Sequence, residues 1–289
     1  MNATTRAAIG RALGSAITAC APRGGGDINE AFQVTLDDGR RIFAKLNDRA
    51  PPGFFESEER GLRWLAAPGV IDVPEVLGVG NGAGGTSPFL LLEWIEPATR
   101  APDFDERLGQ ALAALHRSGA PSFGLDHDNF IAVLPQDNRS ERTWAAFYRE
   151  RRLLPLFERA RQRGHWDAAL DSARDALLSR LDRLTGPDEP PARLHGDLWS
   201  GNLHAGAGGQ PVLIDPAVYA GHREIDLAMM RLFGGFGRRV FDAYAASYPL
   251  APDHHERVAL YQLYPLLVHL CTFGTGYLGQ VASSLERYR

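Results

Sequence analysis

Three polar residues near position 200 have the types and spacing that phosphoryl transfer requires. Asp197 is followed by Asn202 five positions later and by Asp215 thirteen positions further on, in the segments HGDLWSGN (195–202) and IDP (214–216). Transfer of a phosphoryl group from ATP needs one carboxylate for the acceptor hydroxyl, and an amide oxygen plus a second carboxylate for Mg²⁺. The pattern predicts Asp197 as the catalytic base, and Asn202 and Asp215 as the Mg²⁺ ligands.

Each of these residues also has an ordinary structural explanation. An Asp after Gly196 commonly forms a turn, and an Asp that ends an apolar strand can cap a helix. The joint spacing of the three residues favours catalysis over these alternatives. His195, two positions before Asp197, is expected to support the loop, and Asp226 is expected to brace it without reacting.

Lys45 is a charged residue inside the otherwise apolar strand pattern IFAKL. In kinases, a lysine in this position binds the α- and β-phosphates of ATP and pairs with a glutamate of the next helix. The alternative is a lysine that protects a sheet edge against aggregation, a frequent use of this residue. The order of hairpin, lysine and helix favours phosphate binding. The expected helix over 54–67 offers the glutamates Glu56, Glu58 and Glu59.

A run of three glycines, which includes Gly25 and Gly26, precedes the first strand of this hairpin. Glycine backbones let N–H groups approach phosphate oxygens without side-chain obstruction. The run matches neither the GxGxxG fingerprint nor the P-loop, and such runs are usually plain loops. Its place before Lys45 favours a phosphate-covering turn, and we expect the carboxylate of Asp27 to point away from ATP.

Hydrophobic periodicity predicts the elements that hold these residues. In the first part of the chain it predicts helices over 4–20 and 54–67, and strands over 28–36, 41–47, 76–79 and 89–95, with an Asp-Gly turn at 37–40. Later helices are predicted over 104–118, 143–163 and 167–184, and again from 224 and from 253 onward. This order predicts an α+β bilobal fold, with an N-lobe over 1–93, a hinge over 94–98 and a C-lobe over 99–289. ATP is expected between the lobes.

Composition excludes several other classes of protein. The chain has 289 residues, 44% of them hydrophobic and 23% charged, and its net charge of −4 argues against a dedicated nucleic-acid binder. The two cysteines, Cys20 and Cys271, stand far apart, which argues against structural zinc and favours a reducing cytoplasm. No apolar run approaches the roughly 20 residues that a membrane span needs.

The segments HGDLWSGN and IDPAVYAGHREIDLAMMRLFGGF (214–236) resemble the fructosamine (ketosamine) 3-kinase family. Upstream segments that share this resemblance are GGGDINEAF (24–32), FAKLN (43–47), FFESEERGLRWL (54–65) and FLLLEWIEP (89–97). The resemblance implies a protein-kinase-like fold, related to that of aminoglycoside phosphotransferases. It further implies ATP- and Mg²⁺-dependent phosphorylation of the 3-hydroxyl of ketosamines, such as ribulosamines and fructosamines on lysine. The role would be deglycation repair.

The resemblance also assigns residues by position. It implies Glu58 as the partner of Lys45, and backbone groups of Glu93 and Ile95 as the adenine contacts. Residues that would shape the sugar site are Asp126, Asn129 and Trp199. The expected partner is a small-molecule ketosamine or a glycated-protein lysine adduct, without nucleic acid or membrane, and the protein is expected to be a monomer.

The chain departs from the family pattern at two positions, and two other functions are alternatives to a ketosamine kinase. Asp27 stands where many relatives have a cysteine, so regulation through a thiol in this turn is not expected. Ala220 stands where relatives often have a second tyrosine, which affects substrate selectivity. A kinase for another hydroxyl compound, such as an aminoglycoside or an amino alcohol, is the first alternative. A non-catalytic nucleotide-binding module is the second, and it is disfavoured because the base and both metal ligands are present.

Overall fold

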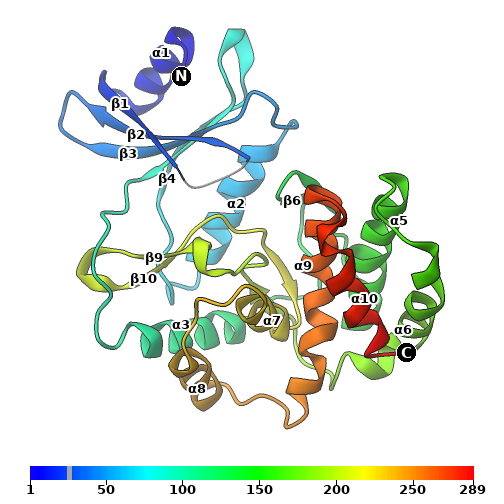
Figure 1. The fold of residues 1–289 in the computed structure, drawn as a ribbon. Coiled ribbons are helices and arrows are strands. Elements are labelled where there is room, and N and C mark those ends of the chain that lie inside the picture. Colours follow the sequence, from blue (N-terminus) through cyan, green and yellow to red (C-terminus); the bar gives the residue numbers. More distant parts are fainter. Residues whose placement is uncertain (25–27) are drawn as a thin grey trace.

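The computed structural model describes residues 1–24 and 28–289 and has two lobes (Figure 1). The N-lobe is built on a five-stranded antiparallel sheet with the strand order β1-β2-β3-β5-β4. Its strands are β1 (Ile17–Arg23), β2 (Glu30–Leu36), β3 (Arg41–Leu46), β4 (Val76–Gly80) and β5 (Phe89–Glu93). The larger C-lobe is mainly helical. This is the α+β bilobal fold that the sequence predicts.

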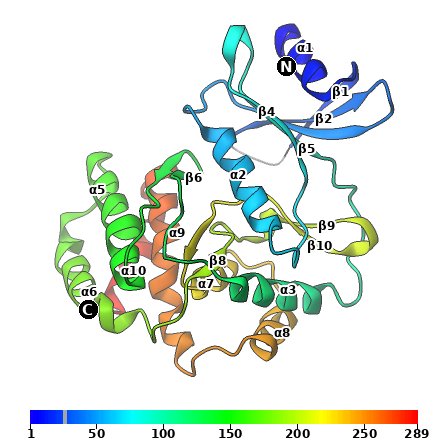
Figure 2. The same cartoon turned by 180° about the vertical axis from the view of Figure 1, so that it is seen from behind.

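The two faces of this sheet are covered by two helices, α1 (Ala3–Leu13) and α2 (Phe54–Ala66), which lie on opposite sides of it (Figure 2). Successive residues of β5 serve different faces, as the period of two in a strand requires. Leu91 packs with Ile9 of α1, whereas Leu90 packs with Leu62 of α2. Because β3 is hydrogen-bonded between β2 and β5, Lys45 lies inside the sheet and is not an edge lysine.

The helix predicted over 4–20 is wrong in its second half. Helix α1 ends at Leu13, and Gly14 caps it in the left-handed conformation with φ of 65°, donating its N–H to the carbonyls of Arg11 and Gly10. Strand β1 then begins at Ile17. Glycine occupies this conformation without steric cost, which makes it the usual residue after a helix end.

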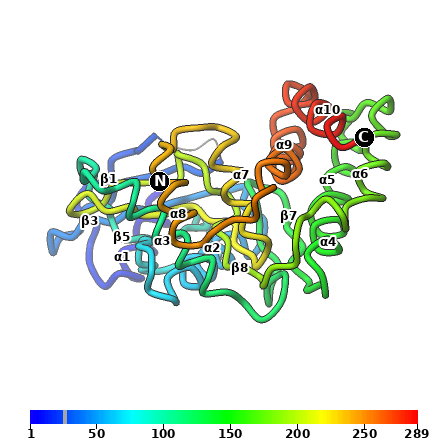
Figure 3. Tube along the Cα trace, turned by 90° about the horizontal axis from the view of Figure 1, so that it is seen from below, coloured from blue at the N-terminus to red at the C-terminus, as the bar shows by residue number. Residues whose placement is uncertain are grey.

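The C-lobe elements largely follow the predicted helices. Helix α3 (Phe104–Ser118) has the predicted bounds, and the prediction over 143–163 corresponds to α4 (Trp144–Phe147), a π-helical segment (Tyr148–Leu153) and α5 (Leu154–Gln162). The remaining helices are α6 (Asp171–Leu184), α7 (Glu224–Leu232), α8 (Arg238–Ser247), α9 (Val258–Phe273) and α10 (Leu278–Glu286). Figure 3 shows α9 and α10 beside α5 and α6 at one end of the molecule.

Short strand pairs position the segment around residue 200. Strand β8 (Ala192–Leu194) pairs with β11 (Tyr219–Gly221), and β9 (Leu203–Ala205) pairs with β10 (Pro211–Leu213). A third pair, β6 (Asn129–Ile131) with β7 (Leu134–Gln136), packs near α2. Asp197 and Asn202 therefore lie in the loop between β8 and β9, and Asp215 follows β10. Across residues 1–24 and 28–289, no helix has the length and apolar character of a membrane span.

Candidate active site

Lys45 lies at the centre of a charge cluster that joins the two lobes. Its side chain is 5% exposed, and its Nζ donates to Glu58 Oε1 at 2.6 Å and to Asp215 Oδ1 at 2.5 Å. Of the three candidate glutamates, Glu58 is thus the one that meets Lys45, while Glu59 pairs with Arg63 at 2.8 Å. The contact with Asp215 brings β3, α2 and the end of β10 together at one point.

Gly61 explains how α2 reaches this cluster. A methyl group on Gly61 would come within 3.2 Å of Val218 Cγ2 and 3.8 Å of Pro216 Cγ. Glycine in a helix interior costs about 1 kcal/mol relative to alanine, so helix propensity does not account for it. Because Gly61 has no side chain, α2 can pack closely against Pro216 and Val218, the segment that follows Asp215. We call this contact the Gly61 seat, and we infer that it sets the distance between Glu58 and Lys45.

A Gly61→Leu substitution is expected to push α2 away from Val218 and to separate Glu58 from Lys45. Overpacking of this kind costs about 1–3 kcal/mol, and displaced binding groups reduce kcat/KM for ATP by about tenfold or more. Steady-state kinetics with varied ATP measure the effect. Ala66→Leu adds the same side chain to an exposed position of α2 and is the matched control. Equal kinetics for the two variants would contradict the importance of this seat.

The loop that carries Asp197 is held by buried backbone contacts. The N–H groups of His195 and Gly196 donate to Asp226 Oδ2 and Oδ1 at 2.8 and 2.9 Å. His195 Nε2 donates to the Ile214 carbonyl at 2.9 Å, which ties the loop to the strand before Asp215. Gly196 has φ of 83°. As the sequence predicts, His195 and Asp226 have structural contacts within the loop.

Asn202 connects the two carboxylates. Its Nδ2 donates to the backbone carbonyl of Asp197 at 2.8 Å and also lies 3.4 Å from Asp197 Oδ2 and 3.3 Å from the Asp215 carbonyl. All three contacts use the nitrogen, so within the described part of the chain Oδ1 has no hydrogen-bond partner and can act as a metal ligand. Asp215 has φ of 54°, an uncommon value for a residue with a side chain. Such backbone strain is often found at functional sites.

The electrostatics of this site differ from one group to the next. Burial and the nearby Asp215 carboxylate raise the pKa of Asp197 to about 7, which increases its affinity for a proton. Burial alone would lower the pKa of Lys45, but the carboxylates of Asp215 and Glu58 reverse this and raise it. Burial lowers the pKa of His195, so this ring is neutral at pH 7 and serves as a hydrogen-bonding group.

The residues expected to contact adenine lie at the end of the sheet. Glu93 ends β5, and its carboxylate accepts from the Glu75 N–H at 3.1 Å. Ile95 follows in the extended link to the C-lobe, where no backbone hydrogen bond to it occurs among the residues described. Its N–H and C=O are therefore available to a ligand. Gly25, Gly26 and the predicted orientation of Asp27 lie outside the described residues.

Two of the three expected sugar-site residues have contacts that point to other uses. Asn129 is 4% exposed, donates to the Val218 carbonyl at 2.8 Å and accepts from Gln136 at 2.8 Å, so its side chain is engaged in the interior. Asp126 lies at the surface, paired with Arg60 of α2 at 3.2 Å. The carboxylate therefore bridges the lobes. Trp199 is 42% exposed and remains accessible to an acceptor.

A group of aromatic rings lies in the C-lobe beyond the turn that packs on Ser200, the residue after Trp199, and the sequence did not reveal it. Gly235 packs directly on Ser200, since a methyl group there would lie 2.5 Å from Ser200 Cβ. The same turn presents Phe233, which is 40% exposed and whose ring centre lies 4.8 Å from that of His269. The rings of Phe273, the last residue of α9, and of Tyr277, in the short turn after it, lie 5.4 and 5.0 Å from that of His269. We call these residues the aromatic strip: Trp199, Phe233, His269, Phe273 and Tyr277.

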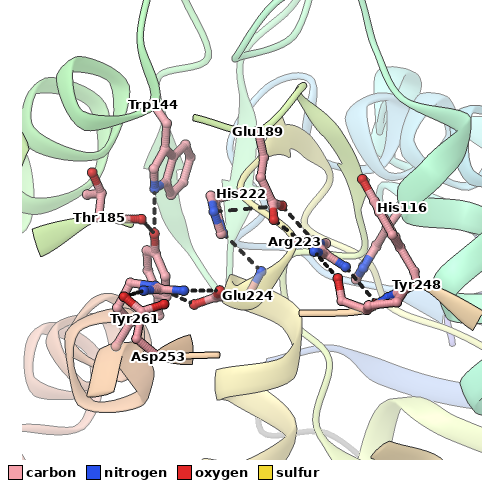
Figure 4. Close-up of polar contacts among 12 residues, drawn as sticks. His116, Trp144, Thr185, Glu189, His222, Arg223, Glu224, Tyr248, Asp253 and Tyr261 are labelled. Atoms are coloured by element: carbon pink, nitrogen blue, oxygen red, sulfur yellow. Dashed lines mark hydrogen bonds and ion pairs between the residues drawn. The ribbon is translucent and has the colours of Figure 1, made fainter. Parts of the chain in front are cut away.

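Helix α7, which carries Asp226, is anchored at its start by buried ion pairs (Figure 4). Arg223 donates to both carboxylate oxygens of Glu189 at 2.7 and 2.8 Å, and also to the Tyr248 carbonyl at 2.8 Å. Glu224 accepts two hydrogen bonds from Arg257 at 2.9 and 2.7 Å. Paired, bidentate geometry is what makes buried charges tolerable. The network fixes the end of α7 nearest to the catalytic loop.

His222 sits inside this network as a neutral ring. Its Nδ1 accepts from the Glu224 N–H at 3.3 Å, its Nε2 lies 3.8 Å from Glu189 Oε2, and it stacks on Tyr261 (Figure 4). Burial lowers the pKa of His222 to about 4, against the attraction of Glu189. The titratable groups around it are Glu189, Arg223, Glu224, Arg257, Tyr261 and His116.

The protein is therefore expected to lose stability in mild acid through His222. Between about pH 4 and pH 6.5 the unfolded chain binds this proton and the folded chain does not, so the free energy of unfolding falls as the pH decreases. The full contribution is on the order of 3 kcal/mol. Urea unfolding at several pH values should show a shallower acid slope for His222→Gln than for wild type. His204→Gln, at an exposed position, is the control, and parallel slopes for His222→Gln and wild type would refute the prediction.

The site fits a magnesium nucleotide. Lys45 offers a buried ammonium for phosphate oxygens, while Asn202 Oδ1 and the partly exposed Asp215 carboxylate offer hard oxygen ligands. Two protein ligands suffice for Mg²⁺, which takes its other oxygens from phosphates and water. When bound, the cation would neutralise phosphate charge.

Comparison with known proteins identifies the family. The sequence pattern of the fructosamine kinase family matches residues 1–289. A ketoamine kinase of Enterococcus faecium, named as probable, is 39% identical over 269 residues, which are 91% of this chain and 93% of that protein. A Thermus thermophilus protein with the same designation is 41% identical over 260 residues, 89% of each chain.

Solved structures agree with the sequence relatives. A candidate fructosamine-3-kinase of Thermobifida fusca matches with a TM-score of 0.90 at 39% identity, over 99% of this chain and 98% of that chain. The aminoglycoside phosphotransferase APH(4)-Ia matches with a TM-score of 0.64 at 16% identity, over 99% of this chain and 97% of that chain. The second likeness shows the fold alone, which is protein-kinase-like. The chain belongs to the fructosamine kinase family and is an ATP-dependent phosphotransferase that acts on a hydroxyl group.

Proposed function

We propose that the protein phosphorylates the 3-hydroxyl of ketosamines, with ribulosamine or fructosamine adducts of lysine as substrates. The observation that carries the proposal is the convergence of Asp197, Asn202, Asp215 and Lys45 at one place, in a chain whose relatives are named ketoamine kinases. Asp197 accepts the proton of the acceptor hydroxyl, and Lys45 binds ATP phosphates. Asn202 and Asp215 hold Mg²⁺, which is the expected metal.

The adenine and sugar contacts are part of the same proposal. Ile95 offers backbone groups to adenine, next to Glu93 at the end of β5. Trp199 forms the wall of the sugar site, two residues from Asp197. Asp126 shapes the sugar site indirectly, through its ion pair with Arg60. Asn129 does so through its hydrogen bond to the Val218 carbonyl.

The aromatic strip favours a ketosamine over a polycationic acceptor. A bound aminoglycoside carries several ammonium groups, which carboxylates would pair with most strongly. Exposed Trp199 and the other rings of the aromatic strip instead offer ring faces, which suit the carbon skeleton of a sugar and a single ammonium group through cation–π contact. The secondary amine of a ketosamine supplies one such charge.

A substrate panel tests this proposal. ADP release is measured with ribulose-lysine, fructose-lysine, choline and kanamycin, each with and without Mg²⁺. Turnover of a ketosamine supports the proposal, and turnover of kanamycin or choline alone would overturn it. Turnover of none, with nucleotide bound, would favour a non-catalytic module.

We further propose a deglycation role. Phosphate on carbon 3 is a leaving group beside the carbonyl at carbon 2, so the product decomposes and frees the amine. The measurable result is release of free lysine from phosphorylated ribulose-lysine, and loss of the adduct from a glycated protein. A stable phosphorylated product would argue against repair.

We also propose a monomer that acts in the cytoplasm. Cys20 and Cys271 are both free, and Cys271 is buried, so neither forms a disulfide within the chain. Size-exclusion chromatography with light scattering tests the oligomeric state, and a dimer mass would contradict the first part. Cell fractionation tests the second.

A further inference from the structure

Arg152 is an unusual residue in the C-lobe because it is buried without an acidic partner. Its side chain is 0% exposed and the largest among the fully buried side chains. It donates to the Asp137 carbonyl at 2.7 Å, to the Arg151 carbonyl at 3.0 Å and to Asn138 Oδ1 at 2.6 Å, and no carboxylate pairs with it in the described residues. Burying a cation against neutral groups is costly, and an apolar side chain would fill the same space without that cost.

The guanidinium instead faces aromatic rings. Its central carbon lies 3.9 Å from the ring centre of Tyr219, 4.6 Å from that of Phe147 and 5.7 Å from that of Tyr264. The rings of Phe147 and Tyr219 also stack at 5.7 Å. Cation–π attraction is strongest when the pair is desolvated, as it is here. The planar guanidinium of Arg152 therefore packs on one face of the Tyr219 ring.

The ring of Tyr219 in turn packs against the catalytic loop. Tyr219 pairs with Leu194 across β8 and β11, immediately before His195. A methyl group on Gly196 would come within 3.4 Å of Tyr219 Cε1 and within 2.1 Å of the Ala217 carbonyl oxygen. The ring thus lies beside Gly196, the residue directly before Asp197, and leaves no room for a side chain there.

A second chain of contacts runs from Arg152 to the same segment. Arg152 donates to Asn138, whose amide donates to Asn129 Oδ1 at 2.8 Å, and Asn129 donates to the Val218 carbonyl. Gln136 reaches the neighbouring Ala217 carbonyl at 3.2 Å. Both routes end on residues 217–219, which pack behind the loop.

The backbone around Arg152 supports a specific use of this position. It belongs to the π-helical segment Tyr148–Leu153, between α4 and α5. π-helical turns are rare and occur frequently at functional sites. The neighbouring Arg151 turns to Asp137 and Glu141, while Arg152 turns inward to Tyr219.

We propose that Arg152 is a positioning residue for phosphoryl transfer, which holds the ring of Tyr219 against Gly196 and so fixes the location of Asp197. It acts through Tyr219 and does not touch substrate. The proposal rests on the assignment of Asp197 as the base. It predicts a loss that falls on kcat and not on the affinity for ATP, because the route through Tyr219 ends on the loop of Asp197, whereas Lys45 is held by Glu58 and Asp215.

Four variants test this proposal in the full-length protein, with the ketosamine that the panel finds active. Arg152→Met removes the charge and keeps most of the volume, and Arg152→Lys keeps the charge but not the planar stack. Tyr219→Leu removes the ring. Tyr219→Phe keeps it and removes only a hydroxyl that has no hydrogen-bond partner in the described structure. Leu177→Ala, in the same core cluster, is the control for lost stability alone.

Arg152→Met and Tyr219→Leu should each lower kcat by about tenfold to a hundredfold, with KM for ATP within about twofold of wild type. Arg152→Lys should lose less than Arg152→Met, Tyr219→Phe should lose less than Tyr219→Leu, and Leu177→Ala should lower Tm without changing kcat. The double variant Arg152→Lys/Tyr219→Leu should lose no more than Tyr219→Leu alone, because both act through one contact.

Several results would overturn the proposal. An unchanged kcat in Arg152→Met with a lowered Tm means that Arg152 only stabilises the fold. If the fold-loss in kcat of the double variant equals the product of the two single losses, the two residues act separately. If Arg152→Met does not fold, Arg152→Lys and Tyr219→Leu still decide. Unchanged activity of Asp197→Asn would instead refute the base assignment, so the two failures are distinguishable.

Discussion

Replacing Asp197 with asparagine is expected to lower kcat by about 10²–10⁴-fold, which is the usual contribution of a general base. Asparagine has the same shape and keeps the contact with Asn202, but it cannot accept a proton from the acceptor hydroxyl. The KM for ATP should stay within about twofold, because Lys45 and Glu58 are untouched. Single-turnover measurements with saturating ATP report the chemical step directly.

This loss should occur without loss of stability. Burial and the Asp215 carboxylate both disfavour an ionised Asp197, so a neutral side chain of the same size relieves a repulsion. Thermal unfolding should therefore give an equal or higher Tm for Asp197→Asn. Asp242→Asn, at the surface of α8, is the control for an amide introduced elsewhere. Normal turnover of Asp197→Asn would show that another group accepts the proton.

The meeting of these residues at one site could be predicted from sequence because they are local or strongly patterned. Asp197 and Asn202 lie in one loop, and Asp215 ends a strand at a spacing that phosphoryl transfer requires. Lys45 stands out because a charge in an apolar strand needs a partner. The predicted pairing with Glu58 is present at 2.6 Å.

Other features depend on contacts between distant segments, which no local pattern contains. The seat of Gly61 on Val218 requires α2 and the segment after Asp215 to meet. The aromatic strip requires α7 and α9 to place Phe233 beside His269. The family resemblance implies Asn129 as a sugar-site residue, and the contact of its amide with the Val218 carbonyl inside the lobe is one that no local pattern contains.

The error after α1 has a different cause. Ala16 and Ile17 fit both the helical period and a strand, so periodicity alone could not separate the two. Gly14 was the deciding residue, since a glycine that follows a helical pattern commonly ends it. The glycine at position 14 therefore indicates the true end of the helix at Leu13 better than the apolar spacing does.

Asp226→Asn is expected to lower the free energy of unfolding by about 3–5 kcal/mol, the range found when one partner of a buried charge pair is removed. The Asp226 carboxylate has 0% exposure and accepts from the N–H groups of His195 and Gly196. Its other neighbour is His116 Nε2, 3.2 Å away. An asparagine amide turns an N–H group toward one of these donors, so at least one donor loses its acceptor.

The effect of Asp226→Asn should depend on pH in a definite direction. Burial alone would raise the pKa of Asp226, but the hydrogen bond and charge of His116 and the Gly196 N–H lower it. A lowered pKa in the folded state stabilises the protein above the unfolded value of about 4, and this stabilisation is lost only in stronger acid. The free energies of unfolding of wild type and Asp226→Asn should therefore differ fully at neutral pH and converge below about pH 4, as urea unfolding measures.

The control variant Asp242→Asn should change the free energy of unfolding by less than about 0.5 kcal/mol, as exposed pairs do. Because Asp226 holds the two residues before Asp197, kcat should fall as well, and an unchanged kcat would show that the loop keeps its place without this carboxylate.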